Sequence, residues 1–317
     1  MDTPTGHDQN ADQIAYWNGA GGKRWADRQP VQDILLQPVA DILIDRARIK
    51  AGERILDVGC GSGSTTFAFA RAVGPSGHVM GIDISGPMLA RARQVTPKGT
   101  PVEFVLADAT VHSFTPENFD LIASRFGVMF FADPALSFAN MRRGLRRSGR
   151  LAFACWREAR ENPFFMTALQ AVYRHVPKMP QVGPEDPGPF SFASQARVKR
   201  ILSAAGFSEV AMEPCNLALD IAVGGGLDAA VKGALEIGPA ARALADQPPD
   251  VVAAAAQSMR EALTPLAKGQ TVPLDAAIWI VTAKAQRRVR QADPLRPGFV
   301  RDARWKRPPT RRGHRHA

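Results

Sequence analysis

The chain has 317 residues, of which 45% are hydrophobic and 22% are charged, so it can bury a full core and is not a disordered polymer. Its formal net charge of +10 would ordinarily favour an anionic partner. However, residues 287–317 hold eleven Lys or Arg against Asp293 and Asp302, which leaves residues 1–286 at only +1. This distribution of charge argues against nucleic acid as the main ligand of residues 1–286.

No apolar run reaches the roughly 18–20 residues that a membrane-spanning helix needs. Residues 1–13 lack the basic start and apolar centre of a secretory signal. Cys60, Cys155 and Cys215 form an odd, widely spaced set without a Cys-x-x-Cys pattern, which fits a reducing compartment and predicts no metal site. We therefore expect a cytoplasmic protein.

Two tryptophans, Trp17 and Trp25, lie close to the start, ahead of a helical pattern from about Val31 to Ile49. One interpretation is that this segment folds over the mouth of a ligand site, with Trp17, Arg24 or Trp25 as its shield. The other is that the indoles anchor a leading helix to the core. The sequence leaves both interpretations open.

A glycine-rich turn follows the first predicted strand, in the stretch Arg-Ile-Leu-Asp-Val-Gly-Cys-Gly-Ser-Gly-Ser-Thr-Thr over residues 54–66. Gly59, Gly61 and Gly63 carry no Cβ, so the chain can turn sharply there. Bare backbone amides can then face a ligand before a helix begins near Ser64. The pattern predicts a cradle for a nucleotide-like ligand.

The next two predicted strands each end in a carboxylate. Asp83 stands twenty positions after Gly63, where an acid can accept the hydroxyls of a ribose, and Asp108 can accept from an adenine amino group. Ser64 stands where a dinucleotide-binding turn requires its third glycine. Asp57 would repel pyrophosphate but suits an ammonium and a sulfonium. These features favour S-adenosylmethionine over a dinucleotide.

A fourth strand is predicted from Phe119 and its exit loop reaches Gly127, and a fifth follows a turn at Ser148-Gly149 and ends at Trp156. With these elements the chain resembles the class I S-adenosylmethionine-dependent methyltransferases, in particular the ubiquinone and menaquinone biosynthesis group and its small-molecule relatives. The resemblance rests on Asp-Val-Gly-Cys-Gly-Ser-Gly, Gly-Ile-Asp-Ile-Ser, Ala-Asp-Ala and Arg-Ser-Gly-Arg-Leu in family order.

The resemblance implies an α/β fold: a Rossmann-like three-layer sandwich whose seven-stranded sheet is mostly parallel, with the last strand antiparallel and with helical lid insertions. It implies S-adenosyl-L-methionine as cofactor. The implied cofactor residues are Asp57, Gly59, Gly61, Gly63, Asp83, Ile84, Met88, Asp108, Ala109 and Arg125. Taken singly, Ile84 and Met88 fit a core equally well.

The remaining sequence suggests three segments: a helical lid at residues 1–50, a methyltransferase domain at 51–286 and a basic tail at 287–317 that we expect to be disordered. Within the domain, a proline-rich stretch at 157–195 and an alanine-rich stretch of two or three helices within 224–268 are predicted lid insertions. The last strand is expected at 277–283.

The predicted function is transfer of a methyl group to a small, apolar or aromatic molecule by in-line displacement. Candidate acceptor or lid residues are Trp17, Arg24, Trp25, Phe126, Met129 and Phe130, and further aromatic candidates are Phe131, Phe164, Phe165, Phe190 and Phe192. No catalytic residue is predicted, because His112, His175 and Asp133 could remove a proton but have no supporting motif.

Two alternatives of another class stay open. The first is a nucleic-acid-binding protein or RNA methyltransferase that uses the basic tail for phosphate contacts. The second is a non-catalytic protein that binds S-adenosylmethionine. Otherwise we expect a small-molecule acceptor as partner, no nucleic acid except through the tail, and a monomer or homodimer.

Overall fold

The computed structural model describes residues 10–180, 183 and 185–286. These belong to one compact unit, residues 1–286, which is distinct from residues 287–317. The predicted basic tail therefore lies outside the described residues. Among the helices that the structure describes, none is long and apolar enough to cross a membrane.

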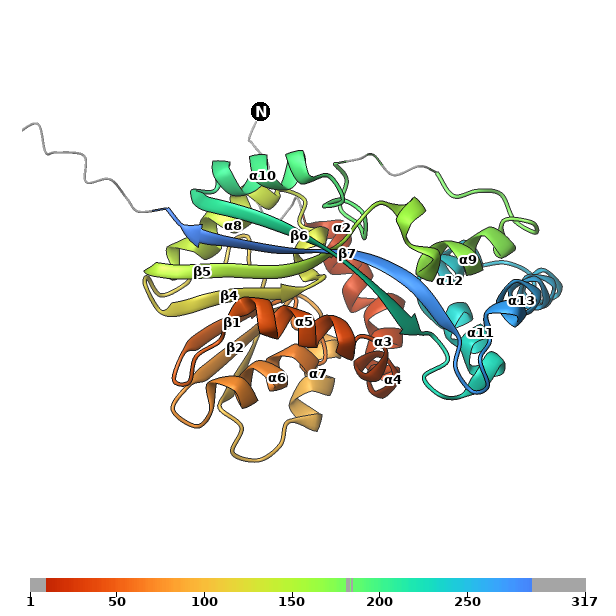
Figure 1. Ribbon diagram of the computed structural model, residues 1–317, viewed down its shortest axis with the longest axis horizontal. Coiled ribbons are helices and arrows are strands. Elements are labelled where there is room, and N and C mark those ends of the chain that lie inside the picture. The colour runs from red at the N-terminus through yellow and green to blue at the C-terminus, as the bar shows by residue number, and fades with distance from the viewer. Residues whose placement is uncertain (1–9, 181–182, 184, 287–317) are drawn as a thin grey trace, which may run out of the picture. The chain divides into compact units, whose positions relative to one another are not determined.

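Seven strands form a single sheet with the order β3-β2-β1-β4-β5-β7-β6 (Figure 1). Strands β1 to β5 are parallel, and β7 lies antiparallel between β5 and β6. This is the predicted fold class, which the structure confirms. The strands are β1 (Arg54–Val58), β2 (His78–Asp83), β3 (Val102–Leu106), β4 (Phe119–Arg125), β5 (Leu145–Trp156), β6 (Phe207–Asp220) and β7 (Pro273–Ala285).

Helices cover both faces of the sheet, as parallel strands joined by right-handed crossovers require. Helices α5, α6 and α7 lie on one face, and α8 and α10 pack together on the other (Figure 1). These helices are α5 (Gln37–Ala47), α6 (Ser64–Val73), α7 (Gly86–Val95), α8 (Pro134–Arg143) and α10 (Gln195–Ala204).

Because both faces are covered, the central strands are apolar almost throughout. In β1, Ile55, Leu56 and Val58 are buried, and in β4, Leu121 and Ile122 are buried. The core continues behind β4 and β5 as a group of aromatic rings, namely Phe119, Phe138, Phe153, Phe192 and Phe207. Phe192, which we expected to line an acceptor pocket, is thus a core residue, and its side chain is almost fully buried.

A second group of helices follows β5 and β6. It comprises α9 (Pro163–Val172), α11 (Gly226–Glu236), α12 (Pro239–Ala243) and α13 (Pro249–Leu263). Leu169 and Val172 of α9 pack with Leu244 and Met259 in an apolar cluster separate from the sheet core. The expected helices of the alanine-rich stretch therefore form, and they pack on a helix from the other predicted insertion.

Two local predictions differ from the structure. The helix expected from Val31 to Ile49 is two helices, α4 (Gln29–Leu35) and α5, because Pro38 sits in the first turn of α5 and lacks an amide for a continuous helix. Strand β5 already begins at Leu145, and a shift in its register with β4 absorbs the predicted turn at Ser148-Gly149.

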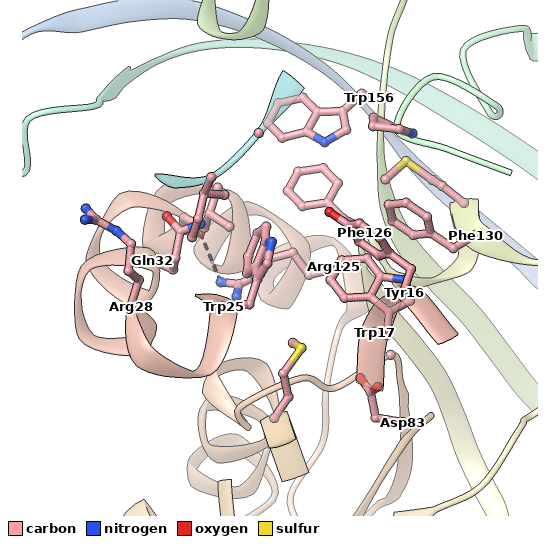
Figure 2. Close-up of a pocket in the computed structure, with 18 of the residues that line it drawn as sticks. Tyr16, Trp17, Trp25, Arg28, Gln32, Asp83, Arg125, Phe126, Phe130 and Trp156 are labelled. Carbon is pink, nitrogen blue, oxygen red and sulfur yellow. Dashed lines mark hydrogen bonds between the residues drawn. The ribbon is translucent and has the colours of Figure 1, made fainter. Parts of the chain in front are cut away.

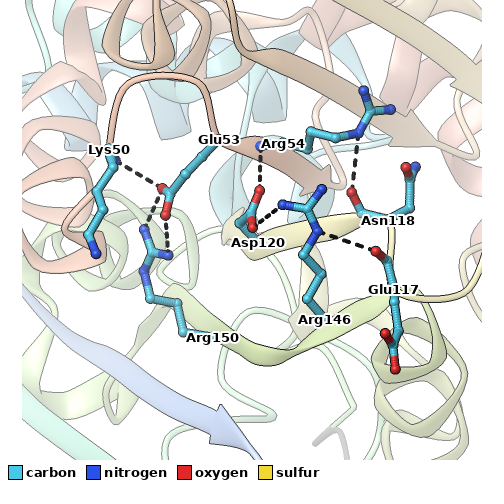
Figure 3. A network of polar contacts seen from close by, with 8 residues as sticks. All are labelled: Lys50, Glu53, Arg54, Glu117, Asn118, Asp120, Arg146 and Arg150. Carbon is cyan, nitrogen blue, oxygen red and sulfur yellow. Dashed lines mark hydrogen bonds and ion pairs between the residues drawn. The ribbon is translucent and has the colours of Figure 1, made fainter.

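The amino-terminal edge of the sheet is held by a polar network (Figure 3). Arg150 of β5 donates to both carboxylate oxygens of Glu53, at 2.8 and 2.7 Å, and the amide of Arg54 donates to Asp120 at 2.9 Å. Arg146 forms an ion pair with the same Asp120. Although burial opposes its ionisation, hydrogen bonds from Arg150 and the Lys50 amide keep the pKa of Glu53 below its ordinary value. This network fixes β1, β4 and β5 at the end away from their carboxyl termini.

Candidate functional site

A pocket of about 300 Å³ opens at the carboxyl ends of β1, β2 and β4 (Figure 2). Ligands of open α/β sheets collect at this edge. Its walls come from three parts of the chain: the amino-terminal helices α2 (Ala11–Asn18), α3 (Ala20–Asp27) and α4, the strand-exit loops, and the helices that follow β5 and β6.

The glycine-rich turn forms the floor below β1. Gly59, Gly61 and Gly63 have φ angles of 66°, 56° and 89°, which only glycine adopts without strain. A Cβ on Gly59 would lie 2.6 Å from the Cα of Gly127, and one on Gly61 would lie 2.6 Å from the Met88 side chain. Gly59 lines the pocket, whereas Gly61 and Gly63 shape the turn. The turn fits a ligand that approaches the backbone closely.

Asp57 lies fully buried behind this turn. One of its oxygens, Oδ2, accepts hydrogen bonds from the hydroxyls of Thr65 and Thr66, each at 2.7 Å. The other, Oδ1, has no partner among the described residues. Burial raises the pKa of Asp57 to about 6, although the two threonines and the charge of Arg125 oppose the shift. A cationic ligand above the turn would offset this uncompensated carboxylate.

Asp83 ends β2 and lines the pocket. Its Oδ2 accepts from the amide of Gly61 at 2.7 Å, and its Oδ1 accepts from the amide of Ser85 at 2.8 Å. Burial raises its pKa against these bonds. Two backbone amides thus hold the carboxylate in one orientation, and each oxygen keeps a lone pair for a hydroxyl donor.

Asp108 follows β3 and also lines the pocket, next to Ala109. Its Oδ1 accepts from the amide of Thr110 at 2.8 Å, and its Oδ2 accepts from the side chain of Asn10 at 2.6 Å. Asn10 is buried and was not predicted, because no local pattern marks it. It joins the start of the described chain to the third strand end.

Helix α2 is fastened to the loop after β2 by further polar contacts. The Ser85 hydroxyl donates to the Trp17 carbonyl at 2.7 Å, and the Asn18 side chain donates to the Ile84 carbonyl at 2.9 Å. The Gly86 amide donates in turn to Asn18, also at 2.9 Å. Trp17 and Trp25 line the pocket with Ile84 and Met88. Arg24 is exposed and does not line it.

An aromatic wall forms the other side of the pocket (Figure 2). The ring of Phe126 stacks on Trp156 with centroids 4.2 Å apart and planes inclined by 7°. Trp156 in turn stacks on Phe164, with centroids 5.5 Å apart. Phe126 has a φ of 69°, which is strained for a bulky residue. Such strain is common at functional sites, and Phe126 lines the pocket. The predicted residues Met129, Phe130, Phe131 and Phe165 also line the pocket, but Phe190 does not. Trp156 was predicted only as the end of a strand.

Three arginines reach this part of the pocket. Arg125, at the end of β4, donates to the Leu36 carbonyl at 3.3 Å, and burial lowers the pKa of its guanidinium. Arg28 forms an ion pair with Glu236 of α11. Arg242 of α12 lies over the ring of Tyr16, 5.9 Å from its centroid.

None of the residues that we considered as proton acceptors lines the pocket. His112 packs against Phe114, His175 hydrogen bonds to Ser258 at 2.8 Å, and Asp133 caps α8 by accepting from the Leu136 amide. Among the described residues that line the pocket, the carboxylates are Asp83 and Asp108, and there is no histidine, lysine or cysteine. The part of the chain that the structure describes also holds no cluster of three metal-binding side chains.

The pocket therefore combines a glycine turn and two strand-terminal carboxylates with an aromatic wall. Together with the strand order, this arrangement defines a Rossmann-like domain with a nucleoside-binding pocket.

Comparisons with known proteins agree with this description of the fold and the pocket. Residues 49–206, about half of the chain, match the family described as "Methyltransferase domain". Aklanonic acid methyltransferase DauC of Streptomyces sp. (strain C5) is 36% identical over 118 residues, which make up 37% of this chain and 54% of that protein. Demethylmenaquinone methyltransferase of Staphylococcus carnosus (strain TM300) is 29% identical over 174 residues, 51% of this chain and 71% of that protein.

Among solved structures, the YcgJ protein from Bacillus subtilis matches with a TM-score of 0.51 at 18% identity, over 78% of this chain and 97% of that chain. This likeness supports the fold. The chain matches only about half the length of DauC. Residues 49–206 thus belong to the methyltransferase domain family, within the class I S-adenosylmethionine-dependent methyltransferases.

Proposed function

We propose that the protein is an S-adenosylmethionine-dependent methyltransferase that acts on a small, apolar or aromatic acceptor. The observation that carries this proposal is the meeting of the glycine turn with Asp83 and Asp108 at one pocket. Both relatives named above are methyltransferases of small molecules by their printed names. The nucleic-acid alternative depends on the tail, which lies outside the described residues.

In this proposal the donor lies along the strand ends. Gly59 faces its methionine end, with the Asp57 carboxylate buried behind the turn, Asp83 receives the ribose hydroxyls, and Asp108 and Ala109 face the adenine, between Ile84 and Met88. The bound donor supplies an activated methyl group on a sulfonium. The protein's part is to align the acceptor with that methyl group and to exclude water, which can account for much of the acceleration.

The acceptor would lie against Phe126, Trp156 and the neighbouring aromatic residues. We assign the lid over it to the amino-terminal helices and to the insertions at 157–195 and 224–268, because Trp25, Phe164 and Ala230 line the same pocket from these three segments. Cys60, Cys155 and Cys215 are free thiols, which is compatible with a cytoplasmic location.

Calorimetry with S-adenosylhomocysteine tests the proposal. We expect the wild-type protein to bind it and Asp83→Ala to bind it at least about tenfold more weakly, because a charge-assisted hydrogen bond to ribose is lost. Asp41→Ala is the control, since Asp41 is exposed on α5 and bonds only to the nearby Gln37 among the described residues. Absence of binding by the wild type, or equal binding by Asp83→Ala, would refute the donor site. A screen of cell-extract metabolites for incorporated labelled methyl then identifies the acceptor.

A further inference from the structure

Two further polar side chains, Gln32 and Arg125, stand near the aromatic wall of the pocket, which Arg28 and Arg242 also reach. Gln32 of α4 is only 8% exposed, and its side-chain amide has no hydrogen bond to any described residue. Arg125 donates to the Leu36 carbonyl at 3.3 Å, and no carboxylate of the described chain forms an ion pair with it. Arg125 is partly buried, and the charges of Asp33 and Asp57 favour its ionisation. Both side chains therefore have hydrogen-bond donors that a ligand in the pocket can use.

The positions of Gln32 and Arg125 in the pocket indicate that they contact the acceptor. Figure 2 shows Gln32 of α4 and the Arg125 guanidinium on the side of the pocket where Trp25 lies, across from Asp83. Helix α4 is held towards the helices after β6 by the ion pair between Arg28 and Glu236. The pair therefore lies beside Trp25 and away from Asp83, although the charge of Arg125 also acts on Asp57 behind the glycine turn.

The same part of the pocket contains no group suited to take a proton. In the proposed function Asp83 and Asp108 bind the donor, and His112, His175 and Asp133 do not line the pocket. An oxygen acceptor reacts here without a protein base most readily when it is already ionised at neutral pH. Carboxylic acids, with a pKa near 4, and acidic enols meet this requirement.

We propose that Gln32 and Arg125 bind an ionised acceptor oxygen, so that the acceptor is a carboxylate or an enolate on a flat apolar skeleton. This inference rests on the proposed methyltransferase function. Arg125 is thereby assigned to the acceptor and not to the donor. The Arg125 guanidinium donates to the anionic oxygen of the acceptor, and the Gln32 amide is a second hydrogen-bond donor to the same oxygen.

Transfer to such an oxygen balances without a proton. A lone pair of the oxygen forms the new oxygen–carbon bond to the methyl group, and the carbon–sulfur bond breaks with its electron pair left on sulfur. The acceptor loses its negative charge and becomes an ester or an enol ether. The neutral product no longer attracts Arg125, which favours its release.

The test uses matched pairs of aromatic probes in the presence of saturating S-adenosylhomocysteine. The pairs are 2-naphthoate with naphthalene-2-carboxamide, and 2-hydroxy-1,4-naphthoquinone, ionised at neutral pH, with its neutral 2-methoxy ether. By calorimetry we expect the wild type to bind at least one anion about tenfold or more tighter than its neutral partner. Arg125→Met should abolish this preference, Arg125→Lys should keep part of it and Gln32→Leu should reduce it.

Arg242→Met is the control, because Arg242 lines the same pocket but lies over Tyr16. It should keep the preference. The inference is overturned if neither anion is preferred or bound by the wild type, or if Arg242→Met abolishes the preference and Arg125→Met does not.

A separate measurement tests whether Arg125 holds the donor instead. Arg125→Met should bind S-adenosylhomocysteine within about threefold of the wild type. If it loses affinity for S-adenosylhomocysteine but not for 5′-methylthioadenosine, which lacks the amino-acid end, the arginine binds the donor carboxylate and our inference is wrong. Binding of S-adenosylhomocysteine by the wild type with no preference for either anion would overturn this inference alone and leave the proposed function standing.

Discussion

At the scale of single residues, Asp57 combines complete burial with one carboxylate oxygen that has no partner among the described residues. Burial raises its pKa to about 6, above the value of about 3.9 in an unfolded chain. Between these two values the folded protein holds more protons at this site than the unfolded chain does. The stability of the ligand-free protein should therefore fall as the pH rises from about 4 to about 6.

Replacement by Asn keeps an oxygen that can accept from the hydroxyls of Thr65 and Thr66 but removes the charge. We expect ligand-free Asp57→Asn to be more stable than the wild type at pH 7 by about 1–2 kcal/mol and to lose most of the slope between pH 4 and 6. Urea unfolding across pH 4–8 measures both effects. We also expect its affinity for S-adenosylmethionine, measured by calorimetry, to fall about tenfold, because the cationic methionine end loses a negative partner.

Asp41→Asn serves as the matched control, since this exposed carboxylate should leave stability and binding unchanged. An unaltered pH slope in Asp57→Asn would show that burial of the carboxylate carries no penalty. An unaltered affinity would remove Asp57 from the donor site.

At the scale of elements, the attachment of α2 to the strand ends depends on a few polar contacts. Asn18 donates to the Ile84 carbonyl and accepts from the Gly86 amide, so it links α2 to both sides of Ser85. Most of the residues of α2 are exposed, and its buried apolar contact is small. Its order should therefore depend on these hydrogen bonds more than on packing.

We expect Asn18→Ala to speed amide hydrogen exchange in α2 and α3 while leaving the sheet unaffected. The expected loss of stability is about 1 kcal/mol, and the expected loss of affinity for S-adenosylhomocysteine is about two- to fivefold. Gln37→Ala is the control, because its side chain bonds to Asp41 within the same helix. Unchanged exchange in α2 would show that the contacts of Asn18 do not hold the helix in place.

What could be predicted from the sequence depends on how far apart in the chain the interacting residues lie. The glycine turn, Asp83 and Asp108 were predictable because each lies at or within two residues of the end of its own predicted strand. Asn10 meets Asp108 across 98 positions, and the contact of Arg125 with the Leu36 carbonyl spans 89. No local pattern records such contacts. The same limit applies to Trp156, whose stacking partner Phe126 depends on a backbone turn that the sequence alone does not indicate for a bulky residue.

At the scale of the whole described unit, the pocket is bounded by segments that are far apart in the sequence. Arg28, between α3 and α4, forms an ion pair with Glu236 at the end of α11, 208 positions away. Both side chains are only partly buried, so the pair contributes modestly to overall stability. The pair joins the amino-terminal helices to the helices after β6 at the wall of the pocket, which Arg28 also lines.

A charge reversal tests this role. We expect Arg28→Glu and Glu236→Arg, each alone, to raise the KM for the acceptor about three- to tenfold and to increase hydrogen exchange in α11, because like charges then face each other. The double variant should recover most of the loss, with a coupling energy of about 0.5–1 kcal/mol. Since Figure 2 shows Arg28 across the pocket from Asp83, affinity for S-adenosylhomocysteine should change little in all three proteins. Additive effects of the two substitutions would instead show that each residue acts independently, and the segments would then be held together by the apolar contacts of the pocket wall alone.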